Sequence, residues 1–404
     1  MKKLLFLGGS DIQIPGIKYA KSLGYYVITC DYLPNNPGHK VSDKYYDIST
    51  TDLKGVLEIA KREKIDGIIA YASDPAALTS SYVSEKMGLP GNRFESTLIL
   101  SNKDSFRKFM EEKGYKHPNF SNVENINEIK NFIIKNGKSI IKPVDSSGSK
   151  GICIVDVESD INAIFKEAKK YTRNGRILIE KFIKRKGKQI CGDVVVVEGQ
   201  MIFAGYGNVH FDDVCDPVTP CSITLPANNG DIIISNLNKT LQNIFTDLNI
   251  TCGTFNVDAI VDEDDNIYVV EIGARNGGNL FTELIKMQSG FDIVRVTLKG
   301  AIEELKISEV VDRDEYNTTP KKKYYAHYVI HSKIDGILDK IEFTDEIENN
   351  IEYKNIKINK GDTINKFNGS NDRLGLCLLG FNTYNEMIDK VENFHSYVKI
   401  KVKK

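Results

Sequence analysis

Two sequence patterns alternate over about the first ninety residues, and this alternation is the strongest constraint on the fold. Short apolar runs at 4–7, 26–30 and 67–71 predict strands, and apolar residues spaced three and four apart at 14–23, 53–64 and 76–87 predict amphipathic helices. This order predicts a doubly wound parallel sheet. Ligands bind such sheets at the carboxyl ends of the strands, so we expect Ser10, Asp31 and Asp74 to lie along one functional rim.

The length and charge of the chain exclude several classes of protein. A chain of 404 residues is long enough for about two or three domains. Its 54 Lys and Arg nearly balance its 55 Asp and Glu, which argues against a nucleic acid or an anionic membrane surface as the partner. No apolar stretch approaches the roughly 18 residues of a membrane span, and the run at 4–7 is too short for a secretory signal. The seven cysteines form no C-x-x-C pair, which favours reduced thiols and a cytoplasmic protein.

A loop of small residues lies between two apolar runs, 139–143 and 151–155. Small side chains allow backbone amides to approach phosphate oxygens closely, although a simple hairpin turn has the same composition. The loop is not a Walker A motif, because G-x-x-x-x-G-K-[ST] is absent. Lys142 lies inside the first run, where a buried ammonium group is costly unless it meets an anion such as a nucleotide phosphate. The candidate phosphate-binding residues are therefore Lys142, Ser146, Ser147, Gly148, Ser149 and Gly151.

A further apolar run, 177–183, leads into a charged segment. The backbone groups of such a strand end can pair with an adenine ring, and the candidates are Glu180, Lys181, Phe182 and Ile183. The simpler interpretation is a core strand without a ligand.

Two carboxylates, Asp258 and Glu271, lie in the apolar runs 254–261 and 267–272, which a short turn joins. Pairing of the two strands would bring both side chains to one point and create an oxygen site suited to Mg²⁺. Arg275 follows on the next loop, where a guanidinium group can hold a carboxylate or a phosphoryl group in transfer. The alternative is two solvated carboxylates and a surface cation.

Histidines give weaker signals. His210 lies in the polar stretch 207–213, which we interpret as a loop after a strand, and it could bind or deprotonate an amine. A surface-loop histidine without a role is the alternative. His327 and His331 are four residues apart in a predicted strand region, which favours a structural role over a metal site.

Taken in order, these segments resemble the ATP-grasp superfamily of carboxylate-amine and carboxylate-thiol ligases, and the resemblance covers nearly the whole chain. By this resemblance Lys103 is the first ATP lysine, Lys142 is the second, and the Ser/Gly loop covers the phosphates. Residues 180–183 become the adenine linker, and Asp258 and Glu271 become the metal carboxylates. Arg275 corresponds to the arginine that stabilises the acyl-phosphate transition state.

The resemblance also implies a domain organisation and a fold class of mixed α/β and α+β type. We expect an N-terminal domain at 1–100 that precedes the grasp fold, and an ATP-grasp domain at 101–310. The latter divides into a lysine and phosphate-loop subdomain at 103–185 and a metal-carboxylate subdomain at 186–310. A C-terminal α+β section, 311–404, would pack on the grasp domain, its Lys-rich linker opening at about Asp312.

Two positions depart from the pattern of the family. Gln189 occupies the place of a glutamate that binds the ribose in many members, and Gly273 occupies the place of a metal-binding asparagine. Asn276 is the candidate for an additional metal ligand.

The resemblance implies an enzyme that binds ATP and Mg²⁺, or Mn²⁺, activates a small-molecule carboxylate as an acyl phosphate, and joins it to an amine. Homodimerisation is an expectation of the same kind. A carboxylase that works through carboxyphosphate is an alternative within the fold, and Gln189 with Gly273 also leaves a non-catalytic nucleotide sensor open. An NAD-dependent oxidoreductase is the remote alternative, because Gly8-Gly9-Ser10 does not continue into G-x-G-x-x-G.

Overall fold

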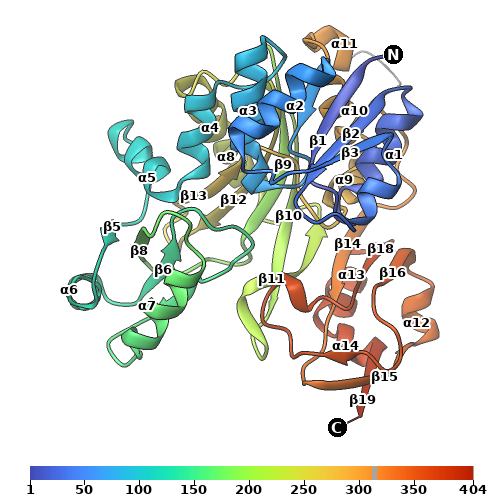
Figure 1. Ribbon diagram of the computed structural model, residues 1–404. Helices are drawn as coiled ribbons and strands as arrows, with labels where there is room; N and C mark the ends of the chain where they lie inside the picture. The colour runs from blue at the N-terminus through green and yellow to red at the C-terminus, as the bar shows by residue number, and fades with distance from the viewer. Residues whose placement is uncertain (312–315, 404) are drawn as a thin grey trace.

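The computed structural model describes residues 1–311 and 316–403, so Asp312, where we expected the C-terminal linker to open, lies outside the described residues. Figure 1 shows the N-terminal section (blue) at the top, a small sheet with its helices at the lower left and the C-terminal section (red) at the lower right. A long central sheet lies between these parts. Within the described ranges, no helix is long and apolar enough to cross a membrane.

The N-terminal section is a parallel four-stranded sheet in the order β3-β2-β1-β4, as the alternation of patterns predicts. Successive residues of β1 face opposite sides of this sheet. Leu5 and Leu7 pack with α2 and α3, whereas Leu4 and Phe6 pack with α1 and with α10 (Ile293–Gly300), a helix some 290 residues later in the chain. The elements are β1 Lys3–Leu7, α1 Ile14–Ser22, β2 Tyr26–Asp31, η1 Pro37–Lys40, β3 Lys44–Asp47, α2 Leu53–Glu63, β4 Gly67–Ile69, α3 Asp74–Met87 and α4 Phe94–Ser101.

The next section is an antiparallel sheet in the order β5-β8-β6-β7 with two helices packed against it. Ile129 and Ile133 of α6 and Ile161 of α7 cover one face of this sheet. The Ser/Gly loop connects β6 to β7, which pair with each other as a hairpin. The elements are α5 Lys103–Glu112, β5 Phe120–Val123, α6 Ile126–Asn136, β6 Ser139–Pro143, β7 Cys153–Val155, α7 Ile161–Lys170 and β8 Ile177–Lys181.

The central sheet has eight strands in the order β13-β12-β9-β10-β11-β14-β18-β16, and all its neighbours are antiparallel. β9 is buried on both faces, with Val194 and Val196 packed toward α8 and Val195 and Val197 toward α9 and α10. The elements before residue 312 are β9 Ile190–Val197, β10 Gln200–Asp212, β11 Asp216–Leu225, α8 Asp231–Asp247, β12 Gly253–Val261, β13 Ile267–Gly273, α9 Phe281–Ser289, α10 Ile293–Gly300 and α11 Ile307–Val311.

The C-terminal section contributes three strands to the central sheet, because β14 pairs with β11 and with β18, and β18 pairs with β16. A second sheet in the order β17-β15-β19 and the helix α13 pack against these strands around Tyr328 and Met387. The elements are β14 Tyr324–Ile330, β15 Gly336–Phe343, α12 Asp345–Glu348, β16 Ile351–Ile356, β17 Thr363–Ile364, η3 Ser370–Asp372, β18 Gly375–Phe381, α13 Tyr384–Glu392, α14 Phe394–Tyr397 and β19 Val398–Lys403.

Candidate active site

The two predicted metal carboxylates lie directly opposite each other on the hairpin β12–β13, where Asp258 pairs with Glu271. This hairpin is the one that the sequence predicts. Burial, and next the charge of Glu271, raise the pKa of Asp258 to about 6, while a hydrogen bond from Gln189 opposes the shift. Two carboxylates held so close favour a cation between them.

Lys103 connects Glu271 to the Ser/Gly loop. It begins α5, and its Nζ donates to the carbonyl oxygen of Ser146 at 2.7 Å and lies 3.6 Å from Oε2 of Glu271. Its backbone amide donates to the carbonyl of Val144 at 3.1 Å, which fixes the start of the helix against the end of β6. The ammonium group is largely buried, so its charge acts on both neighbours with little screening.

The Ser/Gly loop is anchored at several points. Gly148, Ser149 and Gly151 have φ values of +67°, +60° and +72°, a left-handed backbone that glycine adopts most easily. The hydroxyl of Ser149 donates to the carbonyl of Val218 on β11 at 2.9 Å, and Asp145 accepts the backbone amide of Arg173 at 3.1 Å. The loop thus touches both the small sheet and the central sheet.

A buried ion cluster lies behind this loop. Nζ of Lys142 donates to Oε2 of Glu180 at 2.6 Å, and Nε of Arg107 donates to Oε1 of the same carboxylate at 2.6 Å. We expected a nucleotide phosphate to compensate Lys142; the structure shows that Glu180 is already a partner of this ammonium group, and contact with a phosphate stays a prediction. The reason is register: Glu180 pairs with Ile140, two residues before Lys142 on the same face of neighbouring strands.

The strand end expected to bind adenine uses part of its backbone internally. The amides of Lys181 and Phe182 donate to the carbonyls of Asn119 and Lys138 at 2.9 and 3.0 Å, and the side chain of Glu180 belongs to the ion cluster. The groups that we still expect to bind adenine are therefore the backbone carbonyls of this segment and Ile183.

Arg275 follows β13 and is held by the N-terminal section. Its Nη2 donates to Oδ2 of Asp74 at 2.8 Å, and its Nε lies 2.7 Å from Oδ1. Asp74 opens α3 and belongs to the rim that the first strands predict. Asn276, next in the chain, is buried and accepts the amide of Ala72 at 3.3 Å through Oδ1, so its metal role stays a prediction.

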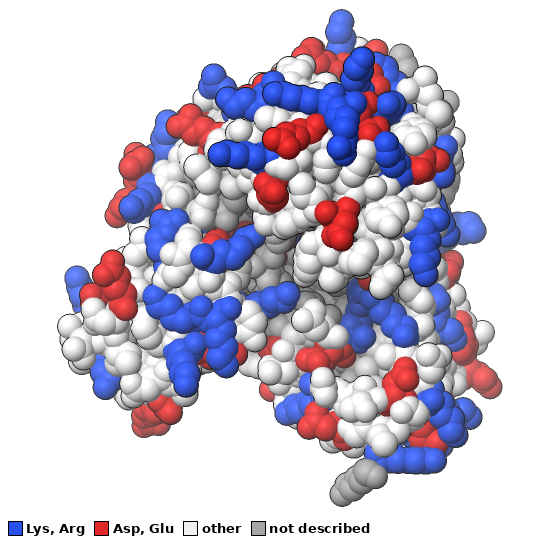
Figure 2. All heavy atoms as spheres, viewed as in Figure 1, with Lys and Arg blue, Asp and Glu red and all other residues white. Residues whose placement is uncertain are grey.

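These parts surround a cleft of about 390 Å³, lined by Asp74, Ser146, Ser147, Arg176, Glu271 and Gly273, among others. In Figure 2 the molecule is hollowed between the upper section and the small sheet at the left. The cleft is therefore lined by part of the Ser/Gly loop, by Asp74 and by Glu271. Lys103 and Asp258 are next to it, because both are neighbours of Glu271.

Comparison with known proteins finds similar sequences and similar folds. Residues 86–201 match the family model described as TupA-like ATPgrasp. The chain is 29% identical over 218 residues to the formate-dependent phosphoribosylglycinamide formyltransferase of Methanocaldococcus jannaschii, which is 52% of this chain and 55% of that relative. The chain thus spans about half the length of this curated relative.

Two solved structures resemble the whole chain. The L-amino acid ligase from Bacillus licheniformis has a TM-score of 0.80 at 18% identity, covering 100% of this chain and 99% of that one. The phosphoribosylglycinamide synthetase from Anaerococcus prevotii has a TM-score of 0.75 at 22% identity and covers 100% of both chains. The chain therefore has the ATP-grasp fold.

The structure differs from expectation at His210. We predicted a polar loop at 207–213, but His210 lies within β10 and is buried, with Nε2 3.1 Å from Oγ1 of Thr224. Burial, and next the charges of Lys188 and His327, lower the pKa of His210 to about 3. The loop prediction is wrong because polar residues such as Asn208 and Thr224 bond to each other across β10 and β11, which lets the strand continue.

Gln189 also has a definite partner. Its amide Nε2 donates to Oδ1 of Asp258 at 3.0 Å, so the residue in the ribose position is bonded to a candidate metal ligand. His327 is buried and accepts the amide of Ile223 through Nδ1 at 3.1 Å, a contact between neighbouring strands.

Sequence reasoning missed two buried charges beside the candidate site, Asp193 and Arg107. Asp193 of β9 accepts the amide of Gly277 at 2.8 Å and the side chain of Asn256 at 2.8 Å, and thereby holds the loop that carries Arg275. Burial raises the pKa of Asp193 to about 6, against these hydrogen bonds. Its signal was a single carboxylate inside the apolar run 190–197. Arg107 gave a similar signal, since it stands beside Phe106 in an amphipathic helix.

Proposed function

We propose that this protein is an ATP-dependent ligase that activates a carboxylate as an acyl phosphate and joins it to an amine, with release of ADP and phosphate. The observation that carries the proposal is the position of Lys103, whose ammonium group contacts both the phosphate loop and Glu271. A cation between a phosphate-binding loop and a metal carboxylate suits a polyphosphate whose terminal group is transferred.

The proposed nucleotide site uses the loop at 145–151 for the phosphates, with Lys103 and Lys142 as cations. Burial lowers the pKa of Lys142, and the carboxylate of Glu180 opposes that shift. Lys142 would therefore act on a nucleotide as part of a fixed charge cluster with Glu180 and Arg107, rather than as a free side chain. Gln189 remains the proposed neighbour of the ribose.

The residues of the β12–β13 hairpin fit a divalent cation. Asp258 and Glu271 offer oxygen donors, which Mg²⁺ and Mn²⁺ prefer. The pKa of Asp258 is raised by burial and next by the negative charge of Glu271, and a cation would relieve the second effect. When bound, the ion would neutralise charge on the polyphosphate. Asn276 is the proposed additional ligand.

The chemistry asks the protein for binding and charge stabilisation rather than a nucleophile. An oxygen of the substrate carboxylate attacks the γ-phosphorus of ATP, and the bond to the bridging oxygen breaks as ADP leaves. The amine nitrogen then attacks the acyl carbon, loses a proton, and displaces phosphate. Arg275, held by Asp74, would stabilise the charge on the transferring group. His210 is the sequence candidate for the proton acceptor, but burial lowers its pKa to about 3, which makes it a weak base toward an amine.

Two cationic side chains near the carboxyl ends of the N-terminal strands support the proposal that the substrate is an anion. Nη2 of Arg373 donates to Asp11 at 3.1 Å, and Lys357 forms an ion pair with the same carboxylate. Asp11 follows the first strand, so one carboxylate here meets two cations. The surplus positive charge would attract the carboxylate of a small-molecule substrate.

The test is product formation from a library of carboxylates and amines with ATP and Mg²⁺, followed by mass spectrometry and ADP release. We expect an amide product and its loss in Glu271→Gln. The matched control is Glu263→Gln, which changes an exposed residue in the turn of the same hairpin and should keep full activity. Full turnover by Glu271→Gln would reject the proposal.

The same assay separates the alternatives. ADP release that depends strictly on bicarbonate would favour the carboxylase, and ATP binding without turnover on any substrate would favour the sensor. Homodimerisation remains a proposal, and light scattering that gives the mass of one chain would overturn it.

A further inference from the structure

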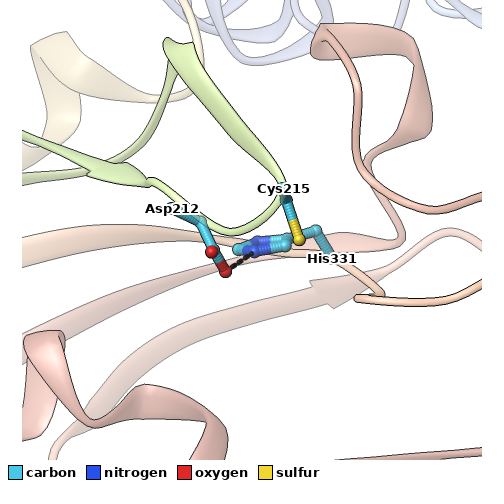
Figure 3. Close-up of side chains that lie close together, drawn as sticks. All are labelled: Asp212, Cys215 and His331. Carbon is cyan, nitrogen blue, oxygen red and sulfur yellow. Dashed lines mark hydrogen bonds and ion pairs between the residues drawn. The ribbon is translucent and has the colours of Figure 1, made fainter.

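A second cluster of polar side chains lies outside the cleft, where the β10–β11 hairpin meets the C-terminal section (Figure 3). Asp212 ends β10, Cys215 lies in the turn before β11, His331 directly follows β14, and His395 belongs to α14. We propose that these four side chains bind one divalent transition-metal ion, with Zn²⁺ the best chemical match.

The donor atoms are already close together. Nε2 of His331 lies 3.1 Å and Nε2 of His395 lies 3.2 Å from the same oxygen, Oδ2 of Asp212, and the two nitrogens are 3.3 Å apart. Ligand atoms on a tetrahedral Zn²⁺ at about 2.0 Å are about 3.3 Å from one another. Cys215 adds a sulfur: the ligand atoms of Asp212, Cys215 and His331 all lie within 4.8 Å of one another.

The orientation of His331 suits a metal ligand. Its Nδ1 lies 2.8 Å from the carbonyl oxygen of Val329, and since a carbonyl can only accept, Nδ1 carries the hydrogen. In the neutral ring Nε2 then directs a lone pair at Asp212 and His395. A proton on Nε2 could satisfy one of these two contacts, whereas a metal ion satisfies both. A backbone carbonyl that fixes the other ring nitrogen is the usual support of a histidine ligand.

The surroundings fit a structural ion. His331 is fully buried, its ring 4.5 Å from that of Phe367 and stacked 5.9 Å from that of Tyr328, whereas His395 is partly exposed and leaves a path to solvent. Lys333 lies 3.6 Å from Oδ2 of Asp212, but its side chain is 43% exposed and can turn toward water when an ion enters. Nitrogen and sulfur donors favour Zn²⁺ over Mg²⁺, so the site differs in chemistry from the carboxylates of the cleft.

The expected consequence is a clamp between distant parts of the chain. The ion would join the hairpin tip to residues more than one hundred positions later, 331 and 395. Three residues after Cys215, the carbonyl of Val218 accepts the hydroxyl of Ser149 in the phosphate loop. An ion in the cluster would therefore also fix the strand on which that loop rests.

The test uses the full chain, freed of metal with a chelator and titrated with Zn²⁺ and Co²⁺ in excess Mg²⁺ and without ATP. We expect one ion per chain, a higher Tm with Zn²⁺, and tetrahedral Co²⁺ bands with a thiolate charge-transfer band. His331→Gln and His395→Gln should each weaken Zn²⁺ binding more than about 100-fold. Loss of a residue that only supports a ligand costs up to about 100-fold, so loss of a ligand itself should cost more. Cys215→Ser should remove the charge-transfer band.

Matched controls are His117→Gln and Cys153→Ser, which change a partly buried histidine and thiol of the small sheet section and should bind as the parent does. Glu271→Gln should also keep the ion. If His331→Gln does not fold by circular dichroism, the more exposed His395→Gln and Cys215→Ser decide. Binding of no ion, variants that bind like the parent, or loss of the ion in Glu271→Gln would overturn the proposal.

Discussion

The buried ion cluster around Glu180 allows a quantitative test of what holds the small sheet together. Glu180→Gln keeps the shape of the side chain but leaves the charges of Arg107 and Lys142 without their shared carboxylate. Burial would raise the pKa of Glu180, but these two cations lower it from 4.5 to about 2. At about 1.4 kcal/mol per pH unit, the shift corresponds to about 3 kcal/mol of stability. This agrees with the roughly 3–5 kcal/mol that breaking a buried ion pair costs.

The assay is urea unfolding followed by far-ultraviolet circular dichroism, because the sequence has no tryptophan for fluorescence. With a denaturant slope of about 1–3 kcal/mol per molar, we expect the midpoint to fall by about 1–3 M. Hydrogen exchange should increase most in β6 and β8, which carry Lys142 and Glu180. The matched control is Glu167→Gln on α7, whose ion pair with Lys170 is exposed to solvent, and it should leave the midpoint unchanged.

The pH dependence gives a second check. Because the pKa of Glu180 is lower in the folded state, its stabilisation is fully present above the unfolded value and is lost as the pH falls from 4.5 toward about 2. The difference in the free energy of unfolding between the parent and Glu180→Gln should therefore be constant near neutral pH and shrink below pH 4.5. Equal midpoints at pH 7, or a difference that does not shrink on acidification, would refute the reasoning.

Three further changes test the cleft. Asp74→Asn removes the carboxylate that holds Arg275, so kcat should fall at least about tenfold with little change in KM for ATP. The control is Asp52→Asn, which exchanges an N-cap residue in the same section and should leave both constants unchanged. Gly151→Ala should weaken ATP binding in calorimetry, because the added Cβ would stand 2.8 Å from Cγ of Pro143; Gly175→Ala shares the positive φ but has open space and is the control. Arg373→Met should raise KM for the carboxylate more than it lowers kcat in steady-state kinetics, and the opposite pattern would remove Arg373 from substrate binding.

The sequence predicted the local elements well where one pattern was strong. The parallel sheet at the N-terminus follows from runs and helices of the right spacing, and the β12–β13 hairpin follows from two apolar runs joined by a short turn. That hairpin also fixes the pairing of Asp258 with Glu271, since a short turn leaves few registers. Lys103 and the Ser/Gly loop were identified as parts of one site from resemblance to a family rather than from spacing.

Only the tertiary structure decided which charges meet. Lys142 was assigned to a phosphate, yet β8 brings Glu180 and α5 brings Arg107 to it, from positions 38 and 35 residues away. His210 was placed in a loop because its neighbours are polar, and cross-strand partners from β11 turned that stretch into a strand.

The histidines show the same division most clearly. The spacing of His327 and His331 favoured a structural role for both, whereas the fold brings His331 to His395, Asp212 and Cys215 from three separate segments. The spacing of apolar residues can be read directly from the sequence, and it determines the helices, strands and short hairpins. Contacts between residues far apart in sequence depend on how the sheets pack, and the sequence alone does not display that packing.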